Sequence, residues 1–125
     1  MNFIRLYNMV IFKINKSDFL PIQAEIDLDY KEINNENINE VMGLRGKFFI
    51  NEFRKVLKEN KSLGIAAYKD NEVVGYGWLK QKTARDPFFR LNNAEGYLAA
   101  FFVKETYRGK KIYPSLITKL IESEK

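Results

Sequence analysis

The sequence contains no cysteine and no histidine among its 125 residues. Without cysteine the chain can form no disulfide and can offer no thiolate as a nucleophile or metal ligand. Without histidine it lacks the most common general base near neutral pH and a usual ligand of zinc. Any proton transfer therefore has to use carboxylates, tyrosines, lysines or water, which argues against most hydrolase triads and metalloenzymes.

Long apolar runs are missing as well. No stretch approaches the ~18 apolar residues that cross a membrane, and the N-terminus lacks the apolar core of a signal peptide. We therefore expect a cytoplasmic protein with no membrane segment. The formal net charge of +5 suits a nucleic acid, an anionic membrane surface or a polyanionic cofactor. This excess is small, because 16 acidic residues accompany 21 basic ones, so most charges are expected on an ordinary solvated surface.

The chain does have enough apolar material for one folded domain. With 46% hydrophobic and 14% aromatic residues, it can enclose one core but is too short for two. Alternating apolar residues predict a first strand over 4–14 and a half-buried second strand over 22–30, paired with the first. The polar face of the second strand carries Glu25, Asp27 and Asp29. Such a row can resemble a metal site, but carboxylates at period two usually mark only the wet face of a sheet.

Two amphipathic helices are predicted next. Asn37 and Glu40 resemble a capping box at the start of the first helix, which Gly46 ends or bends. The second helix starts near Phe49 and ends near Asn60, with its aromatic side chains toward the core.

A β-hairpin is predicted after the helices, with strands at 63–69 and 73–80. The two strands are joined tightly at Asp70 and Asn71. Gly75 and Gly77 lie inside the second strand and predict a bulge or a close approach by another backbone. A long, mostly polar loop over 81–96 follows.

The most informative stretch combines an apolar strand, a basic turn and an amphipathic helix over 97–122. Residues 97–103 carry no charge and no breaker, which is typical of a strand buried on both faces. From Ile112 apolar residues recur at helical spacing, and Pro114 suits a first helical turn. The turn therefore leads into a helix N-terminus, where unpaired N–H groups and the helix dipole bind anions.

Four residues of this turn, Arg108 to Lys111, combine one glycine with three cations. Gly109 lets backbone come close to a ligand, while Arg108, Lys110 and Lys111 add charge suited to phosphate. Taken alone, these four residues leave a solvated basic turn as an equal alternative.

This strand, turn and helix resemble the acetyl-CoA-binding core of the GNAT superfamily of N-acetyltransferases. The family signature is Arg or Gln, two residues, Gly, one residue, then Gly or Ala, and here it reads Arg108-Gly109-Lys110-Lys111-Ile112-Tyr113. Lys111 stands where the signature glycine usually falls, and Tyr113 where a small residue is usual. A backbone N–H exists whatever the side chain, so we expect Lys111 to serve if its φ is negative. The order of predicted elements extends the resemblance from about residue 22 to the end.

The resemblance implies a fold, a cofactor and a reaction. The fold would be α/β (α+β), one domain over 1–125 with a mixed, mainly antiparallel sheet and flanking helices. The pantetheine arm of acetyl-CoA would pair with the core strand at Phe101, Phe102 and Val103. The phosphates would bind at the turn, at Arg108, Gly109, Lys110, Lys111, Ile112 and Tyr113. Acetyl would pass directly to a primary amine of a small molecule or protein, with no metal and no nucleophilic residue.

Glu95, at the start of the core strand, is the predicted general base, acting directly or through a water. A solvated loop carboxylate is its alternative, and Glu105 is a second candidate on the cofactor side. Acceptor contacts are implied at about 42–53. Two other functions stay open: a non-catalytic acyl-CoA-binding protein or remnant, and a basic nucleic-acid-binding module. The order of elements and the apolar core strand disagree with the nucleic-acid module.

The resemblance also implies elements beyond the last helix: a strand that splays from the core strand, another helix and a closing hairpin. The wedge between the two splayed strands would hold the thioester. Only residues 123–125 follow the predicted helix. We therefore expect either a chain truncated after the signature helix or an open sheet edge that a second copy covers in a homodimer. The leading strand 4–14 is another candidate for this cover, unless it only pairs with 22–30.

Overall fold

A computed structural model of the chain describes residues 2–7, 10–15, 20–58, 62–81 and 95–123. For β1, β2, Gln81, Glu95 to Tyr97 and Ala99 it describes the backbone only. The elements are β1 (Asn2–Tyr7), β2 (Val10–Asn15), β3 (Asp29–Glu32), α1 (Ile38–Met42), α2 (Lys47–Lys58), β4 (Ser62–Lys69), β5 (Glu72–Gln81), β6 (Glu95–Val103), the short 3-10 helix η2 (Glu105–Tyr107) and α3 (Ile112–Ser123). No helix within these ranges is long and apolar enough to cross a membrane.

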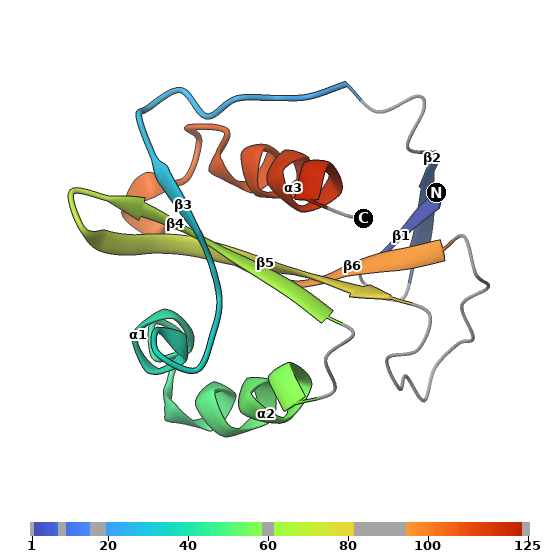
Figure 1. Cartoon of the computed structure of the whole chain (residues 1–125). Coiled ribbons are helices and arrows are strands. Elements are labelled where there is room, and N and C mark those ends of the chain that lie inside the picture. The colour runs from blue at the N-terminus through green and yellow to red at the C-terminus, as the bar shows by residue number, and fades with distance from the viewer. Residues whose placement is uncertain (1, 8–9, 16–19, 59–61, 82–94, 124–125) are drawn as a thin grey trace.

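One mixed sheet of six strands organises the molecule, in the order β2-β1-β6-β5-β4-β3. All neighbouring pairs are antiparallel except β1 and β6, which run parallel. Helix α3 covers one face of the sheet, and α1 and α2 cover the other (Figure 1). The predicted fold class, a mainly antiparallel sheet with flanking helices, is confirmed.

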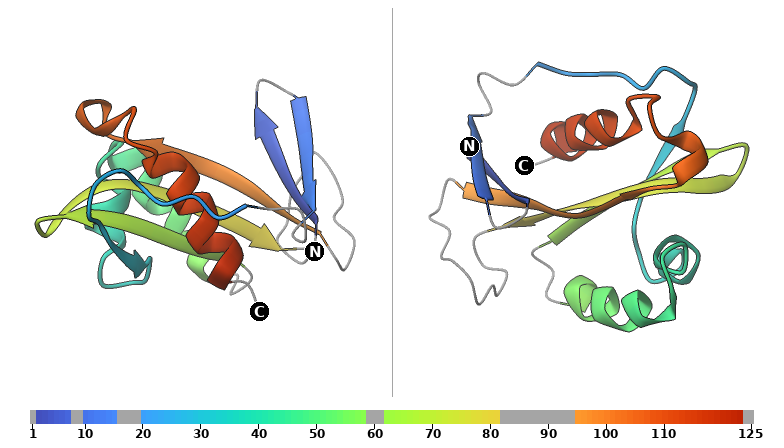
Figure 2. Two further views of the ribbon diagram at one scale, coloured as in Figure 1. Left: turned by 90° about the horizontal axis from the view of Figure 1, so that it is seen from above. Right: turned by 180° about the vertical axis from the view of Figure 1, so that it is seen from behind.

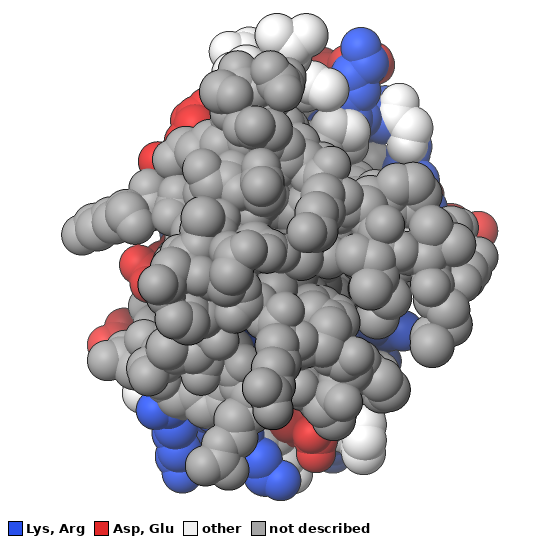
Figure 3. Space-filling view, turned by 90° about the vertical axis from the view of Figure 1, so that its right-hand side faces the viewer, with Lys and Arg blue, Asp and Glu red and all other residues white. Residues whose placement is uncertain are grey.

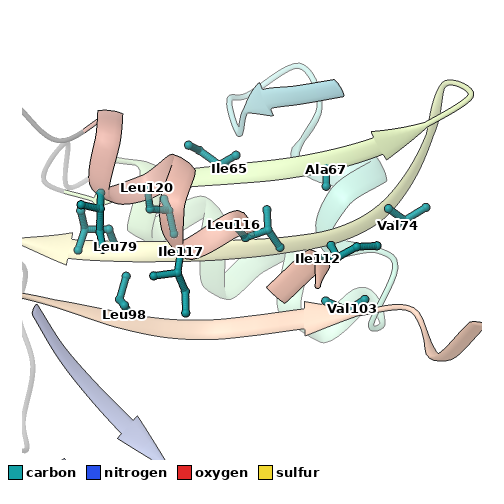
Figure 4. Close-up of a cluster of buried hydrophobic side chains, with 11 residues drawn as sticks. Ile65, Ala67, Val74, Leu79, Leu98, Val103, Ile112, Leu116, Ile117 and Leu120 are labelled. Atoms are coloured by element: carbon teal, nitrogen blue, oxygen red, sulfur yellow. The ribbon is translucent and has the colours of Figure 1, made fainter. Parts of the chain in front are cut away.

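Two apolar clusters form the core, one on each face of the sheet. On the α3 face, Leu116 and Leu120 pack with strand residues that include Leu79 and Leu98 (Figure 4). On the other face, Trp78 is fully buried in the cluster beneath α1 and α2. Strand β5 contributes to both clusters because successive side chains of a strand point to opposite faces. Its place between β6 and β4 makes it a central strand of the sheet.

The prediction of a single strand over 4–14 paired with 22–30 is wrong. The first segment forms two strands, β1 and β2, which pair with one another. Only β3 forms from the second segment, and it pairs with β4. The preceding residues run along α3 instead, where Ile22 N–H donates to Thr118 Oγ1 over 2.9 Å. Their alternating apolar residues pack against the α3 cluster, so the period of two reflects one buried side and not a strand pairing.

The predicted capping box at Asn37 and Glu40 is also wrong. Asn37 occupies the N-cap position of α1 but makes no side-chain capping bond. Its amide instead accepts from Asn34 N–H and donates to Glu32 O. Glu40 accepts from the Tyr68 hydroxyl over 3.2 Å, so both side chains have their partners outside the helix.

The predicted hairpin between β4 and β5 is confirmed. Asp70 and Asn71 have φ values of 51° and 66°, the left-handed pair that a two-residue type I′ turn requires. The predicted helix break at Gly46 is confirmed too, because α1 ends before it and α2 begins after it. The predicted loop over 81–96 lies largely outside the described residues.

Candidate functional site

The junction between β6 and α3 forms the predicted turn. Helix α3 begins at Ile112, as its apolar spacing predicts, and the glycine-bearing turn lies directly before it. Strand β6 ends at Val103, and Lys104 N–H donates to Val74 O over 2.8 Å, which holds the chain beside β5 as it leaves the sheet. Arg108 Nε donates to Val103 O over 3.1 Å, so the arginine ties the turn back to the end of the strand. The turn is therefore anchored at its start.

Backbone conformation in the turn corrects one expectation. Gly109 has a φ of 82° and Lys111 a φ of 59°. Both values lie in the left-handed region, which side chains other than glycine adopt only at a cost. Lys111 thus does not have the negative φ on which its predicted role depended. The turn from strand to helix needs a left-handed residue at this position, which explains why a glycine is usual there.

A cavity of about 770 Å³ lies at this junction. Its size is within the usual range of small-molecule sites. It is lined by the end of β6, the turn and the start of α3, at Glu25, Phe101, Phe102, Val103, Tyr107, Arg108, Gly109, Lys111, Ile112, Tyr113 and Pro114. Eight of the nine predicted cofactor residues are among them. The exception is Lys110, whose carbonyl accepts from Glu25 N–H over 2.8 Å.

Charges at the turn are exposed and weakly paired. The side chains of Arg108, Lys110 and Lys111 lie at the surface. Lys111 Nζ is 3.8 Å from Glu25 Oε1, with both side chains more than half exposed, so solvent screens this ion pair strongly. An anion can therefore replace Glu25 as the partner of Lys111 at little cost. Seen from the side of β1 and β2, the described charged side chains of both signs lie around the rim of the molecule (Figure 3).

Two aromatic rings form the apolar wall of the cavity. The rings of Phe101 and Tyr113 lie 4.6 Å apart between centroids. Phe101 fits here because Gly77 stands beneath it, where an added Cβ would come within 2.4 Å of the ring. A Cβ on Gly75 would lie 3.0 Å from Phe102 O. The predicted close approach by another backbone is thus confirmed at Gly75, whereas the group that approaches Gly77 is the Phe101 ring.

Strand β6 carries a bulge opposite Gly77, a residue that predicted either a bulge or a close approach in β5. The pairing shifts from Tyr76 opposite Phe102 to Trp78 opposite Ala99, so two β6 residues face Gly77 alone. One of the two, Ala100, has a φ of 55°. A bulge removes backbone groups from the regular ladder and redirects them. The glycine in β5 was the one sequence signal of this feature.

A second group of side chains lies on the opposite face of the sheet, and sequence reasoning missed it. Tyr76 is fully buried and stacks on Phe102 at 5.9 Å, while the Arg45 guanidinium lies 6.0 Å from the Phe102 ring. The Tyr76 hydroxyl has no hydrogen-bond partner of normal geometry among the described residues. Burial raises the pKa of Tyr76, although the nearby Arg45 charge opposes this. The hydroxyl therefore stays protonated at neutral pH and can act as a donor.

Glu95, the predicted base, is the first residue of β6, and its backbone pairs with Asn2 of β1. It stands four residues before Ala99, or about 13 Å at the usual rise of a strand. Across the described part of the chain, no group of three or more acidic residues is arranged to hold a metal ion.

A search of curated sequences found no match. A ribosomal-protein-alanine N-acetyltransferase from Brucella melitensis biovar Abortus 2308 aligns with a TM-score of 0.58 at 18% identity, covering 77% of this chain and 70% of its own. A predicted acetyltransferase with acetyl-CoA from Clostridium acetobutylicum aligns with a TM-score of 0.60 at 14% identity, covering 77% of this chain and 72% of its own.

A third solved structure is an aminoglycoside antibiotic 6'-N-acetyltransferase from Acinetobacter baumannii. It aligns with a TM-score of 0.60 at 16% identity, covering 75% of this chain and 69% of its own. At such identities the three structures establish a shared fold. The sequence itself matches the model of the acetyltransferase (GNAT) family over residues 24–124, which is most of its length. This chain therefore belongs to the acetyltransferase (GNAT) family.

Proposed function

We propose that this protein is an N-acetyltransferase that transfers acetyl from acetyl-CoA to a primary amine of a small molecule or protein. One observation carries the proposal: a single cavity joins the end of β6 to a basic turn and a helix N-terminus. Acetyl-CoA needs all three surfaces, because it combines an amide-rich arm with a polyphosphate end. We propose that residues 1–125 act as one such domain, located in the cytoplasm as the sequence predicts.

The phosphate end is proposed to bind at the turn. Gly109 and the start of α3 offer backbone N–H groups, and the helix dipole adds positive potential. Arg108, Lys110 and Lys111 supply the charge. Because the Lys111 ion pair with Glu25 is exposed and weak, binding phosphate costs little there.

The pantetheine arm is proposed to run back along β6. Its amides would pair with the backbone of Phe101, Phe102 and Val103, as an extended peptide pairs with a sheet edge. The Phe101 and Tyr113 rings would cover its apolar part. This path leads from the turn toward the bulge at Ala100.

The reaction is proposed to take place beside that bulge. The amine nitrogen forms a bond to the thioester carbon, the C–S bond breaks, and the thiolate leaves and takes up a proton. Backbone groups that the bulge frees from the ladder are suited to polarise the carbonyl oxygen. Glu95 is proposed to remove the ammonium proton through ordered waters, since about 13 Å of strand separates it from Ala99.

Thermal unfolding with and without acetyl-CoA tests the proposal. At 100 times its dissociation constant, the ligand should add about 2.7 kcal/mol to the free energy of unfolding. For a domain of this size, that corresponds to a rise in Tm of roughly 8–15 °C. A folded protein whose Tm does not change in millimolar acetyl-CoA would rule out the function.

Release of the CoA thiol to a thiol reagent measures transfer to a panel of amines. The assay has no background from the protein, because the chain contains no cysteine. Glu95→Gln should lower kcat by about 100-fold or more while leaving CoA affinity unchanged. Glu105→Gln tests the second candidate and should keep kcat, and a loss of kcat there with Glu95→Gln unaffected would make Glu105 the base. Binding without transfer to any amine would favour the non-catalytic acyl-CoA-binding alternative.

A further inference from the structure

Strand β1 pairs with only part of β6. Their parallel register runs from Asn2 opposite Glu95 to Arg5 opposite Leu98 and ends there. Beyond this point β1 continues to Tyr7 in its pairing with β2. Strand β6 continues to Val103 in its pairing with β5. The two strands are therefore joined at one end and separate at the other, and Figure 2 shows β1 standing at a steep angle to β6.

The separation leaves one edge of β6 open. None of the described strands pairs with residues 99–103 on the side of β1. Backbone N–H and C=O groups on such an edge are available to an extended ligand. The residues that line the cavity from β6, Phe101 to Val103, belong to this same stretch. The open edge thus begins where β1 departs and leads into the cavity.

The bulge lies at the point of departure. Ala100, with its left-handed φ, is two residues beyond Leu98, the last β6 residue that pairs with β1. A ligand arm that starts at the turn and follows β6 from Val103 reaches Ala99 after about 13 Å. Continuing further would require it to displace β1. The end of the arm therefore lies between the two strands.

We infer that β1 forms the second wall of the acyl-CoA site, and that the end of its pairing with β6 sets the position of the thioester. This inference rests on the proposed acetyl-CoA binding. The resemblance to the family placed this wall on a strand after the last helix, whereas here a strand from the start of the chain takes that place beside β6. Residues 6–7, remote in sequence from the turn, then lie next to the sulfur of CoA.

Disulfide trapping tests this placement in the full chain. Since the protein has no cysteine, Leu6→Cys and Tyr7→Cys each introduce a unique thiol. Both positions are needed because consecutive strand residues point to opposite faces. Matched controls are Phe3→Cys and Ile4→Cys, which lie on the same strand within its paired part.

The probe is the mixed disulfide of CoA with 2-thiopyridine. The protein thiolate attacks the CoA sulfur, a protein–CoA disulfide forms, and pyridine-2-thione leaves and is measured by absorbance. The same disulfide made with cysteamine, which lacks the nucleotide, corrects each variant for intrinsic thiol reactivity. We expect a corrected rate at least about tenfold higher for one of the two test variants than for either control, because binding holds the reacting sulfurs together. Acetyl-CoA, which forms no disulfide, should suppress this excess.

Equal corrected rates at all four positions would overturn the inference, provided that the unmodified protein binds CoA. Failure of that protein to bind CoA would instead refute the proposed function. Hydrogen exchange of the unmodified protein gives a second measurement that needs no variant to fold. CoA should slow amide exchange in residues 2–7 as well as in 98–103, and protection of 98–103 alone would contradict a wall formed by β1. In that case, a doubled mass by light scattering would identify a second copy as the cover.

Discussion

Gly77→Ala gives the sharpest test of how the cavity is built. The new methyl carbon would lie 2.4, 2.6 and 2.8 Å from three atoms of the Phe101 ring. Carbon atoms normally rest about 3.5–4.0 Å apart, so the ring must move by about 1 Å. Phe101 is only half-buried and faces the cavity, so it can yield in that direction.

Movement of the ring has two costs. It disturbs the contact with Tyr113, and an aromatic pair of this kind contributes about 0.5–1.5 kcal/mol. It also fills space that the pantetheine arm is proposed to occupy. We expect Gly77→Ala to destabilise the fold by about 1–2 kcal/mol and to weaken CoA binding by about tenfold, or 1.4 kcal/mol.

Gly64→Ala is the matched control. Its methyl would lie 2.7 Å from the Trp78 ring, a similar clash on the opposite face of the sheet. Trp78 is fully buried and packs against Phe53 at 5.0 Å, so it has no space to yield. This variant should lose more stability, about 2–3 kcal/mol, and keep its CoA affinity.

Denaturant unfolding measures the two stabilities, and calorimetry on the folded variants measures CoA affinity. We expect Gly64→Ala to lose more stability than Gly77→Ala, and Gly77→Ala to lose more CoA affinity than Gly64→Ala. Wild-type affinity in Gly77→Ala would refute the proposed path of the arm past Phe101. An equal loss of affinity in both variants would show that overpacking acts through the whole fold.

Four further predictions concern the turn, one buried tyrosine and the acceptor. Arg108→Ala should weaken CoA binding by about 1.5–3 kcal/mol, because the side chain is proposed to contact phosphate. Binding of a phosphate-free pantetheine fragment should not change, and calorimetry that finds equal losses for both ligands would assign Arg108 a structural role. Lys111→Gly should raise the free energy of unfolding by about 1 kcal/mol, because glycine adopts a left-handed φ without the cost that a side chain adds. The control Lys110→Gly should show no such gain in denaturant unfolding. Burial and Glu40 raise the pKa of Tyr68 to about 12. The protonated hydroxyl therefore stabilises the fold below pH 10, and this stabilisation is lost as the pH rises through 12. Tyr68→Phe should have a free energy of unfolding that lacks this fall between pH 10 and 12. Helix α2 carries four basic residues and one acidic residue, so amines that bear a carboxylate should show a lower KM than polycationic aminoglycosides.

Local features of the fold were predictable because neighbouring residues determine them. Asp70 and Asn71 specify a tight turn through their own φ preferences, and the apolar spacing from Ile112 specifies a helix. The position of the glycine-bearing turn followed from this helical spacing and from the apolar strand before it, because the turn has to join the end of that strand to the start of the helix. The side chain of Lys111 gave no hint of its left-handed φ, because the geometry of the whole turn imposes that conformation.

In the second half of the chain the strands, helices and turn could thus be predicted from local sequence, and the family resemblance added eight of the residues that line the cavity. Tertiary contacts set the neighbour of β6, the path of the residues before β3 along α3, and the burial of Tyr76. Strand pairing joins backbone groups that are common to all residues, so an apolar strand carries little local information about its neighbour. The choice depends on which edges remain open after the rest of the core has formed.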